Sequence, residues 1–175
     1  MSTNVNDATP VDMVDSLPTV DPLELRNAMG SFLTGVTIVT AKTSDGEPYG
    51  LTVNSFNSVS LDPPLVLWSL DNGTGKADLF RQAGGFTVNV MGAASPDLIW
   101  LFAKQNTERF FETKWHLGKS AQPVLDDALV SFECRLWAEY PGGDHAIFVG
   151  EVVNISSRDG DPAAFFKGKL GTYSA

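Results

Sequence analysis

Short hydroxyl and amide side chains crowd one stretch of this sequence, residues 50–64 (GLTVNSFNSVSLDPP). With the backbone amides between them, such side chains offer many neutral hydrogen bonds to a flat polar ring and a phosphate. The same residues also suit an edge strand and turn in which Asn and Ser bond the local backbone. The residues alone leave both interpretations open, and the stretch is the first candidate for a binding site.

A glycine-rich segment, residues 73–78 (GTGKAD), fits neither common phosphate-binding motif. It begins like the dinucleotide fingerprint, but Asp78 stands where the third glycine belongs. A P-loop needs a glycine five positions before Gly75 and a Ser or Thr after Lys76, and the sequence has neither. Any phosphate contact in this segment therefore follows another pattern.

Metal sites and hydrolytic triads are not favoured. His116, His145 and Cys134 do not form a cluster with zinc-ligand spacing, so we expect no metal. The G-x-S-x-G elbow is absent, which argues against a Ser-His-Asp hydrolase.

Residues 102–115 combine aromatic side chains with a cation. Phe102, with Phe110, Phe111 and Trp115, could cover a bound cofactor, although aromatic residues at such spacing are more often core. Arg109 could meet a phosphate or carry an exposed charge at a helix end.

The composition argues against nucleic acid and membranes as partners. The chain has 12 basic and 21 acidic residues, a net charge of -9 that is the wrong sign for binding nucleic acid. No apolar run is long enough to span a bilayer and no signal peptide is recognisable, so we expect no membrane partner. Cys134 is the only cysteine, which excludes an intrachain disulfide and favours a cytoplasmic location.

The chain divides into a tail and one domain. Residues 1–20 have no apolar period, which predicts a disordered N-terminal tail, and residues 21–175 form the expected domain. A helix is predicted to begin at Asp21 as N-cap, with Pro22 at its first position and Glu24 in place for a capping box. Its apolar face comprises Leu25, Ala28, Met29, Phe32 and Leu33.

Strands dominate the rest of the domain. Strands are predicted at residues 36–41, 49–53, 58–61, 65–70, 86–90, 129–140 and 145–155. Two helices, at residues 76–83 and 96–105, interrupt them without a regular β-α-β alternation. Many antiparallel strands with few helices predict a mainly β fold, a barrel rather than a doubly wound sheet.

Three blocks in order resemble the flavin reductase family of two-component flavin-dependent monooxygenases. They are residues 26–40 (RNAMGSFLTGVTIVT), the run at residues 52–64, and GDH at residues 143–145 followed by FVGEV at residues 148–152. The similarity spans about residues 23–166, and the set is far more specific than any single block.

The resemblance implies a split β-barrel with a few flanking helices that binds FMN or FAD, usually as a homodimer. By the same resemblance, Thr52, Val53, Asn54 and Ser55 lie along the isoalloxazine ring. Residues near the ribityl chain and phosphate would be Ser58, Val59, Ser60, Thr74 and Lys76.

His145 matches the family histidine near the nicotinamide, where an imidazole helps to orient NADH or NADPH over the flavin. Hydride transfer belongs to the two cofactors, so the protein chiefly supplies stacking, distance and electrostatics. Alternatively, His145 is a turn residue whose ring bonds the backbone. Asp144 would fix that turn or the tautomer of a neighbouring imidazole.

The predicted activity is therefore reduction of FMN or FAD by NADH or NADPH, with delivery of reduced flavin to a separate monooxygenase. Two alternatives are a flavin carrier or sensor without turnover, and another split-barrel oxidoreductase such as a pyridoxamine phosphate oxidase. The sequence does not decide between the two flavins or the two nicotinamides, and it does not identify the partner oxygenase.

Overall fold

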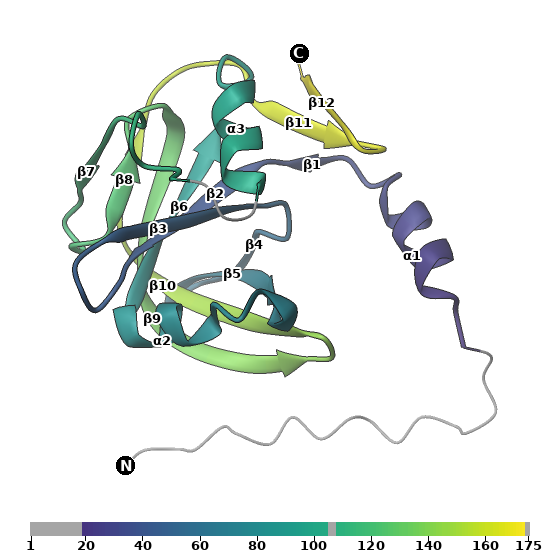
Figure 1. Cartoon of the computed structure of the whole chain (residues 1–175), viewed down its shortest axis with the longest axis horizontal. Helices are drawn as coiled ribbons and strands as arrows, with labels where there is room; N and C mark the ends of the chain where they lie inside the picture. Colours follow the sequence, from purple (N-terminus) through teal and green to yellow (C-terminus); the bar gives the residue numbers. More distant parts are fainter. Residues whose placement is uncertain (1–18, 105–107, 174–175) are drawn as a thin grey trace.

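A computed structural model describes residues 19–104 and 108–173, so the predicted tail lies almost wholly outside the described residues. The helix predicted from Asp21 is α1, Pro22–Met29. The Asp21 carboxylate accepts hydrogen bonds from the backbone N–H groups of Leu23 and Glu24 at 2.9 and 3.0 Å, as an N-cap should. No residue of α1 is buried, and Figure 1 shows the helix standing clear of the rest of the molecule.

Seven antiparallel strands form the main sheet in the order β3-β2-β6-β9-β10-β5-β4. Their bounds are β2 Thr37–Lys42, β3 Pro48–Val53, β4 Asn57–Leu61, β5 Pro64–Asp71, β6 Gly85–Met91, β9 Ala128–Gly142 and β10 His145–Ser157. Every strand predicted from the sequence is present to within two residues. The β-branched run at residues 36–41 marked β2, and the alternation at residues 132–140 marked β9.

The two edge strands of this sheet, β3 and β4, are consecutive in the chain. Only residues 54–56 join them, and so short a link spans no more than about 14 Å of extended chain. The sheet must therefore curl until its two edges approach each other at this corner. The result is a barrel with an open seam between β3 and β4.

Smaller elements complete the fold (Figure 1). They are β1 Thr34–Gly35, η1 Asn72–Thr74, α2 Ala77–Ala83, α3 Pro96–Ala103, β7 Trp115–Leu117, β8 Pro123–Leu125, β11 Ala163–Phe166 and β12 Lys169–Thr172. The order β1-β11-β12 makes a small sheet, β7 and β8 form a hairpin, and α3 packs against β3 and β2. Among the described residues, no helix has the length and hydropathy needed to cross a membrane.

Two clusters of buried side chains hold the barrel together. In the first, Trp68 of β5 stacks on Phe148 of β10 with ring centroids 5.0 Å apart, and Phe80 of α2 meets both rings. In the second, Phe102 and Ile99 bring α3 against the inner residues of β2 and β6. Helix α2 packs against β2 and β6, and helix α3 packs against β3 and β2. The two helices thus hold in place the residues around the β3 edge.

Candidate functional site

A cavity of about 820 Å³ runs along β3 and is called the β3 cavity below. Its volume falls in the upper part of the range of about 300–1,000 Å³ that is typical of small-molecule sites. Five of the predicted site residues line it, namely Thr52, Thr74, Lys76, Phe102 and Arg109. The remaining lining residues are Glu47, Pro48, Tyr49, Gly50, Leu51, Gly73, Ala103, Glu108, Phe110, Phe111 and Trp115.

The cavity exists because β3 is an edge strand, with one row of backbone groups left outside the sheet. Arg109 bridges this edge to the end of α3, since its guanidinium donates hydrogen bonds to the carbonyl oxygens of Gly50 and Lys104. Gly50 lets the strand pass close to α3: a Cβ there would lie 2.8 Å from Cε1 of Phe102. The helix, the arginine and the glycine together shape the cavity wall.

Two cations meet at Tyr49 inside the β3 cavity. Lys76 Nζ lies 5.6 Å and Arg109 Cζ 5.7 Å from the centroid of the Tyr49 ring, within the range of cation–π attraction. Phe80 holds the tyrosine ring edge-on at 5.9 Å. The cavity lining therefore pairs two cations at Tyr49 with two carboxylates, those of Glu47 and Glu108.

Two hydroxyls of the predicted ring-binding run are engaged in backbone bonds. Thr52 Oγ1 donates to the carbonyl oxygen of Ile99 at 2.7 Å. Ser55 Oγ accepts from the Ser69 N–H at 2.9 Å and lies 3.2 Å from the Ser69 carbonyl oxygen. These side chains hold together the corner between β3, β5 and α3. The exposed Asn54 and the half-buried Val53 lie at the seam between β3 and β4.

The second half of the run forms the other side of the seam. Ser58, Val59 and Ser60 lie on the edge strand β4, whose pairing with β5 shifts by one residue between Ser58 and Ser60. Val59 is the extra residue of this bulge and is 49% exposed. None of these three side chains lines the β3 cavity, whereas Thr74 and Lys76 do.

His145 opens β10 and pairs with Asp71 of β5. Its Nδ1 lies 2.7 Å from the Asp144 carboxylate, and this hydrogen bond lowers the pKa of Asp144. The pair fixes the ring and directs Nε2 away from the carboxylate. The Asn72 N–H donates to the Asp144 carbonyl oxygen at 3.0 Å, which ties this turn to the η1 turn whose Gly73 and Thr74 line the cavity.

The aromatic residues divide between core and cavity mouth. Phe102 is fully buried, so it occupies a core position and only its ring edge reaches the cavity wall. Phe110 packs edge-on between Phe102 and Trp115, at 5.0 and 5.8 Å. Phe111 is 83% exposed, and any covering role therefore falls to it rather than to Phe102.

The one cysteine contributes no nucleophile to this region. Burial, with a smaller contribution from the charge of Glu133, raises the pKa of the Cys134 thiol to about 12. The thiolate is therefore scarce at neutral pH. What the described residues around the cavity offer is hydrogen bonding, positive charge and aromatic surface, which is the equipment for binding and orienting a cofactor.

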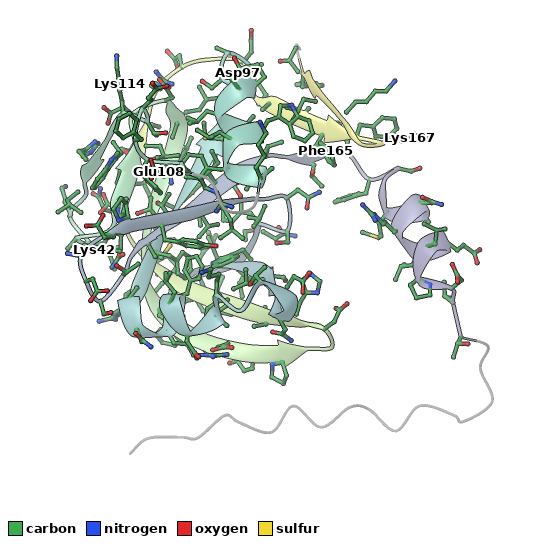
Figure 2. All side chains as sticks on the ribbon, in the orientation of Figure 1. Lys42, Asp97, Glu108, Lys114, Phe165 and Lys167 are labelled. Atoms are coloured by element: carbon green, nitrogen blue, oxygen red, sulfur yellow. The ribbon has the colours of Figure 1, made fainter. Side chains whose placement is uncertain are left out.

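Glu47, Tyr49 and Glu108 are polar cavity residues that were not expected from the sequence. Tyr49 immediately precedes the hydroxyl-rich run on the edge strand β3, and Glu47 precedes β3 itself. Figure 2 labels Glu108, which precedes Arg109 in the segment that follows α3. No local pattern connects these residues, because they meet only through the curl of the sheet.

Comparison with known proteins supplies the family. The sequence model described as flavin reductase like domain matches residues 29–174. The FMN reductase (NADH) SmoA of Agrobacterium fabrum is 45% identical over 149 residues, covering 85% of this chain and 84% of that protein. The reductase component of 4-nitrophenol 4-monooxygenase/4-nitrocatechol 2-monooxygenase from Rhodococcus opacus is 36% identical over 157 residues, covering 90% and 84%.

The fold agrees with solved structures of such proteins. The NADH:FAD oxidoreductase SgcE6 of Streptomyces globisporus, in complex with NAD and FAD fragments, matches with a TM-score of 0.82 at 35% identity, covering 90% of this chain and 98% of that one. The predicted fold class, a mainly β split barrel with a few flanking helices, is confirmed. By sequence and by fold, this chain belongs to the flavin reductase family.

Proposed function

We propose that this protein binds an oxidised flavin at the seam between β3 and β4, reduces it with NADH and passes the reduced flavin to a separate monooxygenase. The similarity to NADH-dependent reductases and to a monooxygenase reductase component supports this activity. The observation that carries it is the β3 cavity, which opens beside Thr52 and holds the two cations at Tyr49.

The flavin ring lies along Thr52, Val53, Asn54 and Ser55. Because the hydroxyls of Thr52 and Ser55 already bond the backbone of Ile99 and Ser69, their role is to hold the strand corner rigid. The polar edge of the ring then meets backbone groups and Asn54, which suits a neutral heteroaromatic ring. Ser58, Val59 and Ser60 border the opposite side of the seam.

The flavin phosphate lies near Thr74 and Lys76, and Arg109 is the second cation at the Tyr49 ring. Lys76 Nζ makes no ion pair with any described residue, so its charge remains available to an anion. Arg109 donates to two backbone carbonyls and acts chiefly by holding the cavity wall in place. A phosphate is therefore recognised mainly by Lys76, because the Thr74 hydroxyl already donates to the Asp71 carbonyl oxygen and the Gly73 N–H to the Asp71 carboxylate.

His145 orients the dihydronicotinamide, and Asp144 orients His145. When bound together, the two cofactors supply the redox chemistry: NADH gives up a hydride and the flavin accepts it with a proton. The protein's contribution is to hold the two rings at reacting distance and to exclude competing geometries. With 42% of its side chain exposed, His145 is accessible to a cofactor that enters from solvent.

A coupled absorbance assay tests the activity. Purified protein is mixed with NADH and either FMN or FAD, and the loss of NADH absorbance is followed under anaerobic conditions. We expect consumption of NADH that depends on both protein and flavin, and NADPH serves as the second donor for comparison. Flavin binding without NADH consumption would instead establish a carrier, and the absence of both would refute the proposal.

A homodimer is part of the proposal. The apolar side chains on and after α1 are exposed, including Leu25 (54%), Met29 (58%) and Phe32 (67%). An eight-residue helix is not stable alone in water, so its apolar face requires a partner surface. A second copy of the chain supplies that surface, and the resulting dimer contains two flavin-binding seams.

The domain assignment also belongs to the proposal, with residues 21–175 as the flavin-binding unit and residues 1–20 as a tail. The only cysteine is buried and unbridged, so the fold does not depend on an oxidising compartment. This supports the cytoplasmic location expected from the sequence.

A further inference from the structure

A layer of buried polar side chains joins the β7–β8 hairpin to the main sheet. Thr40 Oγ1 of β2 donates a hydrogen bond to the Pro123 carbonyl oxygen of β8 at 2.5 Å. In the turn of the hairpin, the Gln122 side chain accepts from the Lys42 N–H at 2.8 Å and donates to the Ala83 carbonyl oxygen at 3.3 Å. The buried side chains of this polar layer are Thr40, Asn89, Gln122, Ser131 and Glu133.

Asn89 of β6 lies at the centre of the polar layer. Its side chain is fully buried, and the amide nitrogen donates to the Ile38 carbonyl oxygen at 2.9 Å and to Thr40 Oγ1 at 3.0 Å. The amide oxygen accepts from the Leu125 N–H at 3.0 Å and from the Ser131 hydroxyl at 3.1 Å. An amide has two N–H donors and one oxygen with two lone pairs, so Asn89 makes every hydrogen bond that it can make. One side chain therefore links β2, β8 and β9 to β6.

The hairpin that Asn89 holds carries part of the wall of the β3 cavity. Trp115 of β7 lines the cavity and pairs with Leu125, the β8 residue whose N–H donates to Asn89. Trp115 also packs edge-on against Phe110, which lines the cavity as well. No side chain of the polar layer lines the cavity itself. A displacement of β8 would therefore move Trp115 and change the shape of the cavity.

We propose that Asn89 is a positioning residue for flavin binding, which acts by fixing Leu125 and thereby holding Trp115 in place. A fully satisfied buried network favours one geometry, because a displacement leaves a buried donor or acceptor without a partner. An apolar contact alone would let β8 shift against the sheet at a smaller cost. The inference rests on the proposed function, because it takes a flavin as the ligand of the β3 cavity.

Asn89→Ala tests this role. The dissociation constant of FMN is measured by quenching of flavin fluorescence, at a temperature where circular dichroism shows the variant folded. We expect the constant to rise about tenfold. Thr87→Val is the matched control, since Thr87 is equally buried on the same strand but its hydroxyl has no hydrogen-bond partner among the described residues. An unchanged constant in Asn89→Ala, or an equal rise in the control, would overturn the proposal.

A double-mutant cycle separates positioning from a general loss of stability. Trp115→Ala alone should weaken FMN binding about tenfold, and adding Asn89→Ala should change the constant by no more than about a factor of two. Such non-additivity is expected only if Asn89 acts through Trp115. Effects that multiply would show that Asn89 acts on the fold as a whole, and normal binding by Trp115→Ala would also overturn the proposal.

Thr40→Val carries the same test if Asn89→Ala does not fold. It keeps the shape of the side chain but removes the hydroxyl that donates to Pro123, so it should raise the FMN constant about threefold or more, and only when Trp115 is present. If the parent binds FMN and oxidises NADH while these variants bind FMN equally well, the proposed function stands and the positioning role is wrong. If the parent binds no flavin, both fail.

Discussion

The two histidines in this chain share one hydrogen-bond geometry, and this allows a controlled test of His145. Each places Nδ1 2.7 Å from an aspartate carboxylate, His145 with Asp144 and His116 with Asp126. Only His145 adjoins the turn that lines the β3 cavity. His116 therefore serves as a control for His145, because it makes the same hydrogen bond at a different place in the fold.

We expect His145→Ala to raise the KM for NADH about tenfold, which corresponds to the loss of roughly one hydrogen bond or ring contact. The affinity for flavin in the absence of NADH should stay within a factor of two, because His145 does not line the cavity. His116→Ala should change neither quantity. Steady-state kinetics with a flavin titration on each variant checks this, and an equal effect from both histidines would mean a general structural role.

At the scale of elements, Glu133 of β9 pins the turn between β7 and β8. The side chain is buried, and its carboxylate accepts hydrogen bonds from the Ser120 N–H and the Asn154 side-chain amide, each at 2.7 Å. Burial alone would raise the pKa of Glu133, but these hydrogen bonds and the nearby Lys119 outweigh it and lower the pKa below 4.5. The ionised form therefore stabilises the fold.

The sign of the pH effect follows from this lowered pKa. The stabilisation is fully present above the unfolded pKa of about 4.5 and is lost as the pH falls through the lower pKa of the folded state. Glu133→Gln keeps one accepting oxygen but places an amide donor opposite one of the two donors, and should cost about 2 kcal/mol at pH 7. Its loss of stability between pH 5 and 3 should be shallower than that of the parent. Denaturant unfolding at several pH values measures both effects, and parallel pH profiles would contradict the assignment.

Sequence patterns over a few residues predicted the positions of most helices and strands, but not which residues meet in the folded chain. Asp21 and Pro22 marked the start of α1, and the β-branched run at residues 36–41 marked β2, because caps and strand propensity act over a few residues. The two-residue β1 and three-residue β7 and β8 carry too few residues for a period to appear. The meeting of Lys76 and Arg109 at Tyr49 depends on three separate elements, so no local pattern could reveal it.

At the scale of the whole molecule, one side carries α1 and the small sheet together. Figure 2 labels Phe165 and Lys167 on the β11–β12 hairpin, on the side from which α1 projects. The Lys167 N–H donates to the Gly30 carbonyl oxygen at 2.8 Å and anchors the end of α1 to this hairpin. A second apolar pocket, lined by Leu33, Phe166 and Leu170 among others, opens on the same side. These features together make this side the expected dimer surface.

Phe32→Asp should shift the protein from dimer to monomer, because it places a charge in the centre of the proposed apolar contact. Sedimentation should then give a mass near the 18.8 kDa of one chain, whereas the parent should give twice that value. Leu117→Asp, which alters another exposed apolar residue (51%) on β7, should stay dimeric. If the parent itself sediments as a monomer at micromolar concentration, α1 must be covered by something other than a second copy. A monomeric parent that still reduces flavin would show that each seam works without its neighbour.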